Sequence, residues 1–367
     1  MTAAPPLHER ERGAIWAVLS DKAGDNAQVD AVIERLPWPV ERKTLVFKQP
    51  FRKGKPPFLA SLYHVDKTRS DRLEAPWPSL VLTIGRRPAM AALWIRRRSG
   101  NRTRIVLFGR PKRDLREFAL IVASAQFSVP AAANVIETTL PLMRVDERKI
   151  AAAADAWRDV LAPMPRPRIA VLAGGATRPY AFGAAEAREL LDRARRYAGG
   201  GSLYVTTSRR TGRDAVAALR ASLPDGARFW QWGDTSPNPY LGLLACADGF
   251  VVTGDSMSMI TEVARLGRPL AIYPLPMRPL TRFARRALPP ALAALPTRIK
   301  YQWLPKLGFT AFPRDLTLVH RALITRGHAV WAGEPFPTAP PPLDDDVDAV
   351  ARAIVATVEC PTPPSTR

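Results

Sequence analysis

The amino-acid sequence predicts an α/β protein made of two domains of alternating strands and helices, with a cleft between them. The chain has 367 residues, which is too long for one ordinary core. Short apolar runs alternate with helical segments in both halves, as in parallel sheets covered on both faces. A proline-rich stretch, Pro163–Pro167, separates the halves, and no helix or central strand can continue through it. A cleft between two such domains is a common place for ligands.

The first half, residues 1–145, is predicted to form the first domain. Apolar runs indicate strands at residues 13–19, 41–47, 79–85, 104–108 and 120–123. Helical spacing of Val29, Val32, Ile33 and Leu36 predicts a helix over residues 28–36. A second helix follows the turn at Gly85 and runs through Trp94 to Arg97.

The second half repeats this rhythm after a hinge at residues 146–167, which contains an Ala-rich helix over 149–161. The second domain is placed at residues 168–334. Strands are expected at residues 168–172, 202–206, 228–231, 249–253 and 269–273, and helices at 182–197, 213–222, 240–245, 277–295 and 315–326. Residues 335–367 would form a linker, an amphipathic helix over 345–358 and a tail.

Composition limits the partners and the compartment. The net charge of +21 and the pI near 10.9 attract nucleic acid, anionic lipid or phosphorylated ligands. Nucleic acid is not expected, because no nucleic-acid-binding motif accompanies the charge. The N-terminus does not read as a signal peptide, no apolar run is long enough to span a bilayer, and two cysteines give no disulfide framework. We therefore expect a cytoplasmic protein, with the inner membrane surface as a place for peripheral contact.

The stretch Val251–Pro269 carries the strongest functional pattern. A buried strand is followed by the turn Gly254–Ser256 and then by a helix, which places free backbone N–H groups at the carboxyl edge of a sheet. Phosphate-bearing ligands bind at such edges. Glu262 lies further along the helix, where its carboxylate can reach a sugar hydroxyl. The alternative interpretation is an ordinary strand–loop–helix unit capped by Ser256 or Ser258.

Three other turns in the second half admit both a structural and a binding role. The pair Gly174–Gly175 permits a tight turn or close approach of a ligand to the backbone. The turn Ser208–Thr211 is either a solvated loop or a phosphate site that uses a guanidinium. Asn238 and Tyr240 either start a helix or line a pocket for a base.

Taken together, these motifs resemble the elongated-mitochondria family, whose bacterial members are called mitochondrial fission proteins. The resemblance covers about residues 13–275, and the Ala, Arg and Pro bias of the chain is that of a GC-rich bacterium. The motifs that carry it are SDKAGDNAQ at 20–28, the Gly85-Arg-Arg turn, Gly174–Gly175, SRRT at 208–211, Asn238-Pro-Tyr240 and TGDSMSMITE at 253–262. The family implies a GT-B-like fold, in which the last helix crosses back to the first domain.

The end of the motif is also similar to the donor site of GT-B glycosyltransferases. That similarity implies that Glu262 holds the ribose of a nucleotide and that the start of its helix faces the diphosphate. The residues expected to bind the nucleotide sugar are Gly174, Gly175, Ser208, Arg209, Thr211, Asn238, Tyr240, Asp255, Ser256, Ser258 and Glu262.

The first domain departs from those enzymes, because Ser20–Gly24 replaces a Gly-rich loop that carries a histidine. Asp21 is the candidate general base, although an aspartate in this position also forms Asx-turns. Gly24, Arg86 and Arg87 are expected on the acceptor or phosphate side.

Three functions follow as hypotheses. The first is a glycosyltransferase that uses a nucleotide-diphosphate sugar and a lipid-linked acceptor, with no metal and no further cofactor. The second is a membrane-associated scaffold without catalysis, and the third is a nucleotide-sugar epimerase, for which no acid/base pair is identified. His8, His64, His320 and His328 lack metal-ligand spacing and are interpreted as structural or exposed.

Two basic stretches bear on membrane contact. Residues 48–58 interleave lysine and arginine with aromatic residues, and residues 86–116 are rich in arginine. Charge runs are usually solvated surfaces, but cations interleaved with aromatic residues also suit an anionic membrane surface.

Overall fold

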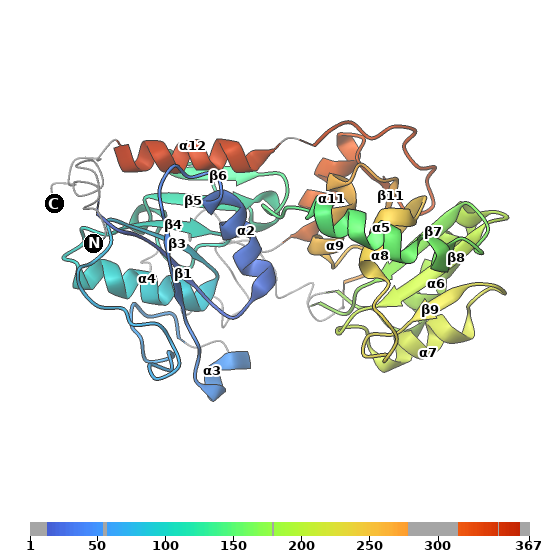
Figure 1. Cartoon of the computed structure of the whole chain (residues 1–367), viewed down its shortest axis with the longest axis horizontal. Coiled ribbons are helices and arrows are strands. Elements are labelled where there is room, and N and C mark those ends of the chain that lie inside the picture. Colours follow the sequence, from blue (N-terminus) through green and yellow to red (C-terminus); the bar gives the residue numbers. More distant parts are fainter. Residues whose placement is uncertain (1–12, 54–56, 178–179, 278–314, 344, 360–367) are drawn as a thin grey trace. The chain divides into compact units, whose positions relative to one another are not determined.

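The computed structural model describes residues 13–53, 57–177, 180–277, 315–343 and 345–359. The described residues form two compact units (Figure 1). The first contains the described residues up to Leu142 and the segment from Asp345, and the second contains those from Met143 to 277 and from Asp315 to 343. The α/β class predicted from the sequence is confirmed, because each unit is built around one parallel six-stranded sheet.

The sheet of the first unit has the order β2-β1-β3-β4-β5-β6, and every pairing in it is parallel. Its strands are β1 (Ile15–Leu19), β2 (Glu41–Thr44), β3 (Leu80–Ile84), β4 (Arg104–Phe108), β5 (Leu120–Ser124) and β6 (Val135–Thr138). Five of them lie where the apolar runs predict strands. The sixth, β6, was not predicted, since its residues are mostly half-buried and form no apolar run.

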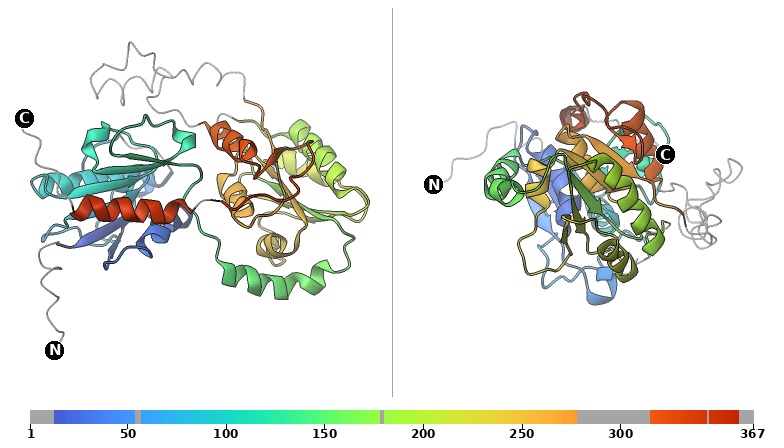
Figure 2. Two further views of the ribbon diagram at one scale, coloured as in Figure 1. Left: turned by 90° about the horizontal axis from the view of Figure 1, so that it is seen from above. Right: turned by 90° about the vertical axis from the view of Figure 1, so that its right-hand side faces the viewer.

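Both faces of this sheet are covered. Ile15, Ala17 and Leu19 of β1 point to one face, against helix α2 (Ala23–Ile33) and helix α12 (Asp346–Glu359). Trp16 and Val18 point to the other, against helix α4 (Arg86–Arg98). Figure 2 shows α12 lying along the first sheet. The strands are therefore buried on both sides, as parallel strands usually are.

The C-terminal helix crosses back to the first unit, as expected. Val347, Val350 and Ile354 of α12 are fully buried in the core that contains α2. Arg104 at the start of β4 donates hydrogen bonds to the carbonyl oxygens of Thr357 and, at 3.1 Å, Val358. Since the last carbonyls of a helix have no partner within it, this arginine stabilises the end of α12.

The second unit has the strand order β12-β11-β10-β7-β8-β9, again with every pairing parallel. Its strands are β7 (Arg168–Ala173), β8 (Ser202–Thr207), β9 (Arg228–Trp230), β10 (Gly249–Thr253), β11 (Leu270–Tyr273) and β12 (Val330–Trp331). The first five were predicted. The two-residue edge strand β12 is too short to leave a pattern in the sequence.

Helices of the second unit are α5 (Glu147–Leu161), α6 (Ala184–Ala198), α7 (Arg213–Ala221), α8 (Tyr240–Cys246), α9 (Met257–Arg265) and α11 (Leu316–Thr325). The segment expected to be a hinge contains α5, which packs on α8 within the second unit. A Cβ atom added at Gly242 of α8 would lie 2.2 Å from Cγ of Trp157 on α5, so glycine is required for this close contact.

Each sheet has one point at which the strand order reverses. In the second unit this switch point lies between β7 and β10, and in the first unit it lies between β1 and β3. In parallel α/β sheets, ligands bind outside the carboxyl ends of the strands at such points. The loops after β7 and β10 contain the predicted residues Gly174, Gly175, Asp255 and Ser256. The loop after β1 contains Asp21, and Arg86 begins α4 directly after β3.

Some boundaries differ from the predictions. Helix α2 begins at Ala23, five residues before the predicted start, because its first turns are polar and show no apolar spacing. The short helix α3 (Gln49–Lys53) was not predicted. The helix expected over residues 277–295 lies, beyond its first residue, outside the described residues, as does His8. Among the described helices, none has the length and hydrophobicity needed to cross a bilayer.

Candidate functional site

Asp255 ties together the loops at the switch point of the second unit. Its carboxylate accepts hydrogen bonds from the backbone N–H of Gly175 at 3.0 Å and from the hydroxyl of Thr253 at 2.8 Å. A guanidinium nitrogen of Arg210 lies 2.9 Å from the same carboxylate. The side chain of Asp255 is fully buried, and burial raises its pKa although the charge of Arg210 opposes the shift. This carboxylate therefore positions the loops rather than facing solvent.

The glycine pair is required by the packing of the loops against each other. A Cβ atom at Gly174 would lie 2.3 Å from a carboxylate oxygen of Asp255, and one at Gly175 would lie 2.0 Å from the carbonyl oxygen of Arg210. The N–H of Gly174 donates to the hydroxyl of Thr253 at 2.7 Å. Both glycine amides thus already have partners inside the loop cluster.

The turn Ser208–Thr211 is held by its own side chains. The hydroxyl of Thr211 accepts from the N–H of Ser208 at 2.9 Å and donates to the carbonyl oxygen of Gly174. Arg210 pairs with Asp255 and also donates to Thr177, whereas Arg209 is exposed. The sequence singled out Arg209, and the structure adds Arg210, whose side chain is 41% exposed.

The start of α9 lies at the same edge of the sheet. Ser256 precedes the helix and is almost completely buried, and its hydroxyl makes no capping hydrogen bond to the helix. Ser258 lies in the first turn and is exposed. Because the first amides of a helix have no intrahelical acceptor, this end carries a partial positive charge suited to an anion.

Glu262 and Tyr240 form a pair one and a half turns into α9. The hydroxyl of Tyr240 donates to one carboxylate oxygen of Glu262. Burial raises the pKa of Glu262 above its ordinary value, with the tyrosine hydrogen bond opposing the shift, and burial together with the Glu262 charge raises the pKa of Tyr240 well above its own. Asn238 has a different role, because its side-chain oxygen accepts from the N–H of Tyr240 at 3.0 Å and so caps α8.

The ring of His320 packs against Gly254 in the turn Gly254–Ser256. No functional role was predicted for this histidine from the sequence. A Cβ atom at Gly254 would lie 2.8 Å from Cε1 of His320, so the ring fills the space under this glycine. The ring meets Trp331 edge to face, with the centroids 5.9 Å apart. Burial lowers the pKa of His320 to about 4, so the ring is neutral at pH 7.

Trp232 lies at the same carboxyl edge and was also missed. It follows β9 and is 51% exposed. Its backbone N–H donates at 2.9 Å to the hydroxyl of Thr207, directly before the turn Ser208–Thr211. An exposed tryptophan beside a loop cluster of this kind can stack on a planar ligand. Its position two residues after the end of the short strand β9 is the signal that could have identified it.

The predicted acceptor residues gather at the switch point of the first unit. Asp21 and Gly24 follow β1 and are exposed, and Arg86 and Arg87 begin α4 directly after β3. Burial lowers the pKa values of Arg86 and Arg87. The charge of Asp21 raises the pKa of Arg87, so Asp21 lies near this arginine. The guanidinium of Arg87 lies over the ring of Phe47, 5.3 Å from its centroid.

The two groups of predicted residues therefore lie at the switch points of two different sheets. The group in the second unit combines the guanidinium of Arg210, the N-terminus of α9, the buried carboxylate of Asp255 and the exposed indole of Trp232. Among the described residues, no group of three or more His, Cys, Asp or Glu side chains gathers as metal ligands would. These groups of the second unit are suited to a ligand in which an anion is joined to a polar, planar group.

Several solved structures are similar in architecture at low sequence identity. The UDP-GlcNAc 2-epimerase from Methanocaldococcus jannaschii is 8% identical, with 94% of this chain and 99% of that chain covered and a TM-score of 0.49. The structure of MurG from Acinetobacter baumannii is 12% identical, with 94% and 91% covered and a TM-score of 0.40. Similarities of this size assign no function to the chain.

Sequence comparison gives a family. The Arabidopsis thaliana protein named mitochondrial fission protein ELM1 is 29% identical over 222 residues, which are 54% of this chain and 52% of that protein. The chain thus spans about half of the length of this relative. The family model described as mitochondrial fission ELM1 matches residues 23–288, which include β7 and β10 at the switch point of the second unit. The chain therefore belongs to the mitochondrial fission ELM1 family.

Proposed function

We propose that the second unit binds a nucleoside diphosphate sugar and that the protein is a glycosyltransferase of the GT-B type. The observation that carries the proposal is the loop cluster around Asp255, which places the start of α9 and the Glu262–Tyr240 pair at the switch point of a parallel sheet. Phosphate and ribose recognition use such edges in parallel α/β folds.

The proposal assigns the diphosphate to the first turn of α9. Its free amides, the hydroxyls of Ser256 and Ser258 and the exposed part of Arg210 supply donors and positive charge. Arg209 is the second cation on this side. The amides of Gly174 and Gly175 are already bonded, so these residues shape the loop instead of binding the phosphates.

The ribose is assigned to Glu262. Glu262 lies five positions after Met257, the first residue of α9, which is a rise of roughly 7.5 Å along the helix axis. This rise fits the distance between the diphosphate and the ribose of one nucleotide. One carboxylate oxygen of Glu262 accepts the hydrogen bond from Tyr240, and the other accepts hydrogen bonds from the ribose hydroxyls. Trp232 is assigned to the base, which stacks on its exposed indole.

The proposed reaction transfers the sugar to a hydroxyl group of the acceptor. The acceptor hydroxyl attacks the anomeric carbon, the bond from that carbon to the diphosphate breaks, and the electron pair leaves with the nucleoside diphosphate. Asp21 is the candidate base that takes the hydroxyl proton. The proposal includes no metal or further cofactor, since Arg209, Arg210 and the α9 N-terminus oppose the charge that develops on the leaving diphosphate.

Calorimetric titration of the full chain with UDP-, GDP-, CDP- and CMP-linked sugars tests the proposal. We expect micromolar binding of one of them and at least tenfold weaker binding by Glu262→Gln. Glu147→Gln, an equal loss of charge at the exposed start of α5, is the matched control and is expected to bind normally. Absence of binding by every nucleotide sugar would refute the proposal.

Family membership favours the scaffold hypothesis as the second candidate, because the plant relative is named for mitochondrial fission and not for a reaction. A scaffold without catalysis predicts no nucleotide-sugar binding. The same titration therefore separates the two functions.

A further inference from the structure

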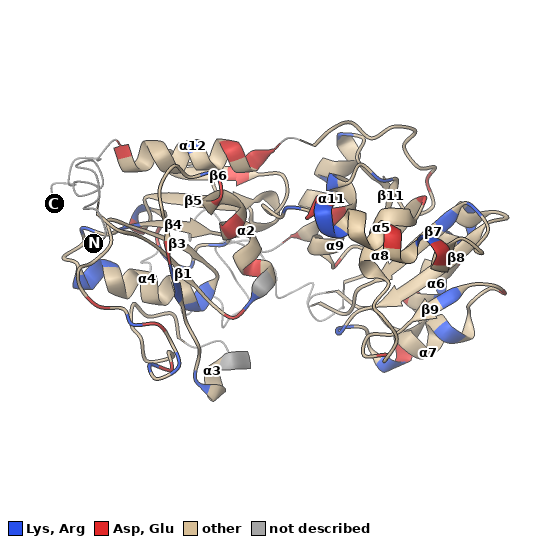
Figure 3. Ribbon diagram, in the orientation of Figure 1, with Lys and Arg blue, Asp and Glu red and all other residues tan. Residues whose placement is uncertain are grey.

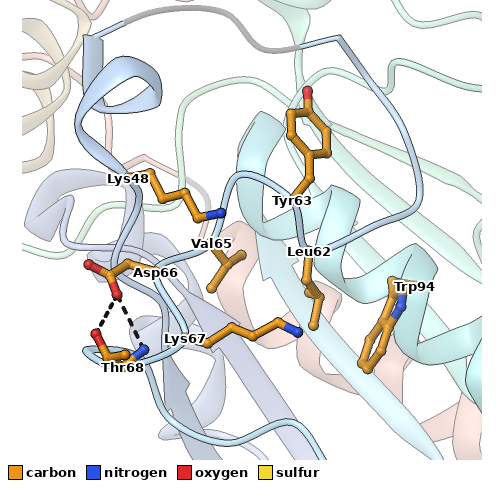
Figure 4. Close-up of a pocket in the computed structure, with 8 residues that line it drawn as sticks. All are labelled: Lys48, Leu62, Tyr63, Val65, Asp66, Lys67, Thr68 and Trp94. Carbon is orange, nitrogen blue, oxygen red and sulfur yellow. Dashed lines mark hydrogen bonds between the residues drawn. The ribbon is translucent and has the colours of Figure 1, made fainter.

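The first unit also contains a hollow whose lining includes none of the predicted acceptor residues. It has a volume of about 500 Å³ and lies between the third turn of α4 and the loop that carries residues 62–68 (Figure 4). Its lining residues are Lys48, Leu62, Tyr63, Val65, Asp66, Lys67, Thr68 and Trp94. None of these was assigned to donor or acceptor.

The floor of the hollow is apolar and held in place. Trp94 of α4 meets Trp77 edge to face, with the centroids 5.7 Å apart, and the guanidinium of Arg98 lies 5.7 Å from the Trp94 ring. Leu62 lies beside Trp94, and Val65 is buried. An indole fixed by two neighbours gives a contact surface that loses little conformational freedom on binding.

The rim of the hollow is cationic. Lys48 and Lys67 are exposed, and Figure 4 shows both amines extending toward the space in front of Leu62. Within the part of the chain that the structure describes, neither amine lies within ion-pair distance of a carboxylate. Asp66 also lines the hollow, and one oxygen of its carboxylate accepts from the hydroxyl of Thr68 at 2.7 Å and from its N–H at 3.2 Å.

Further positive charge lies on α4, the helix that carries Trp94. Figure 3 shows basic residues at both ends of α4, and the C-terminal end carries Arg96, Arg97 and Arg98. The hydroxyl of Tyr63 donates to the carbonyl of Pro57 at 2.8 Å, so its hydrogen is already used. A ligand that matches the hollow must therefore carry a negative charge next to an apolar part.

We infer that this hollow binds one anionic phospholipid of a membrane surface. The headgroup phosphate lies between Lys48 and Lys67, and the first methylenes below the glycerol lie against Leu62 and Trp94. A free phosphate would satisfy the lysines but leave the apolar floor exposed. A membrane lipid satisfies both, and the inference does not depend on nucleotide binding by the second unit.

Sedimentation of the full chain with vesicles tests the inference. Vesicles of phosphatidylcholine containing one third phosphatidylglycerol are compared with vesicles of phosphatidylcholine alone. We expect binding to the anionic vesicles, and we expect the double variant Lys48→Gln/Lys67→Gln to bind about 30-fold more weakly, since each cation near the surface contributes about 1 kcal/mol. Trp94→Leu, which keeps an apolar side chain, is expected to weaken binding by a smaller factor.

The control removes two charges elsewhere. Arg188 and Arg196 are exposed on α6 of the second unit, and Arg188→Gln/Arg196→Gln lowers the net charge equally. We expect this variant to keep the wild-type affinity. Equal weakening by both double variants would show that the overall charge binds the membrane and would overturn the site. Wild-type binding to neutral vesicles, or complete release by millimolar inorganic phosphate, would also overturn it.

Discussion

The guanidinium of Arg210 lies 2.9 Å from the carboxylate of Asp255, although the two residues follow different strands. Arg210 comes after β8 and Asp255 after β10, and β7 lies between these two strands in the sheet. The pair therefore spans the loop after β7, and the amide of Gly175 in that loop completes the contact. The geometry of the candidate nucleotide site depends on this pair.

Replacing Arg210 should destabilise the second unit. Arg210→Gln leaves the buried carboxylate of Asp255 without its counter-charge, and we expect a loss of about 2 kcal/mol in the free energy of unfolding. This is less than for a fully buried pair, because the arginine is partly exposed. Arg209→Gln, at the exposed neighbouring position, should change it by less than about 0.5 kcal/mol. Urea denaturation measures both, and equal effects would contradict the assigned role.

A methyl group at Gly175 should disrupt the loop cluster. The added Cβ would lie 2.0 Å from the carbonyl oxygen of Arg210, so the backbone must shift, at a cost of about 1–3 kcal/mol. Gly200→Ala is the control, because nothing lies within 4 Å of a Cβ there. Thermal unfolding of the two variants gives the comparison. A Gly175→Ala protein as stable as Gly200→Ala would show that the loops are not packed as described.

His320 should make stability depend on pH. Its folded pKa of about 4 lies below the ordinary value of 6.5, so the unfolded chain binds the proton more tightly. Its contribution is fully present above pH 6.5 and is lost as the pH falls toward 4, by about 3 kcal/mol.

His320→Gln should remove this part of the pH dependence. Burial also lowers the pKa of His64, so some loss at low pH will persist in the variant. The difference between wild type and variant, measured by urea denaturation from pH 7.5 to pH 4.5, isolates the contribution of His320. Parallel curves for the two proteins would contradict a buried neutral ring.

Trp232 should contribute to nucleotide affinity without contributing to folding. Removing a stacked base contact in Trp232→Ala is expected to weaken nucleotide binding by about 1–3 kcal/mol, since base–aromatic stacking has this size. Inorganic pyrophosphate has no base, so its affinity should not change. Calorimetry with both ligands makes the comparison, and equal weakening of the two would place the base elsewhere.

The sequence predicts most of the fold because the central strands are buried on both faces and leave continuous apolar runs, as in β3 and β10. It does not predict β12, which is two residues long, or the polar first turns of α2. The glycine pair and the Ser208–Thr211 turn were identified as parts of a site, but the Arg210–Asp255 pair was not. That contact depends on the order of strands in the sheet, which no local pattern reveals. Choosing between Arg209 and Arg210 requires the geometry of the turn.

The most direct test of the central claim measures whether Glu262 binds the ribose. The nucleoside diphosphate that binds best is titrated, with and without its 2′- and 3′-hydroxyls, against wild type and Glu262→Gln. Hydrogen bonds to a charged group contribute about 1.5–3 kcal/mol, so loss of the hydroxyls should weaken binding to wild type roughly 10- to 100-fold. The same loss should have little effect on binding to Glu262→Gln. An equal loss of affinity in both proteins would show that Glu262 does not contact the ribose and would contradict the proposed site.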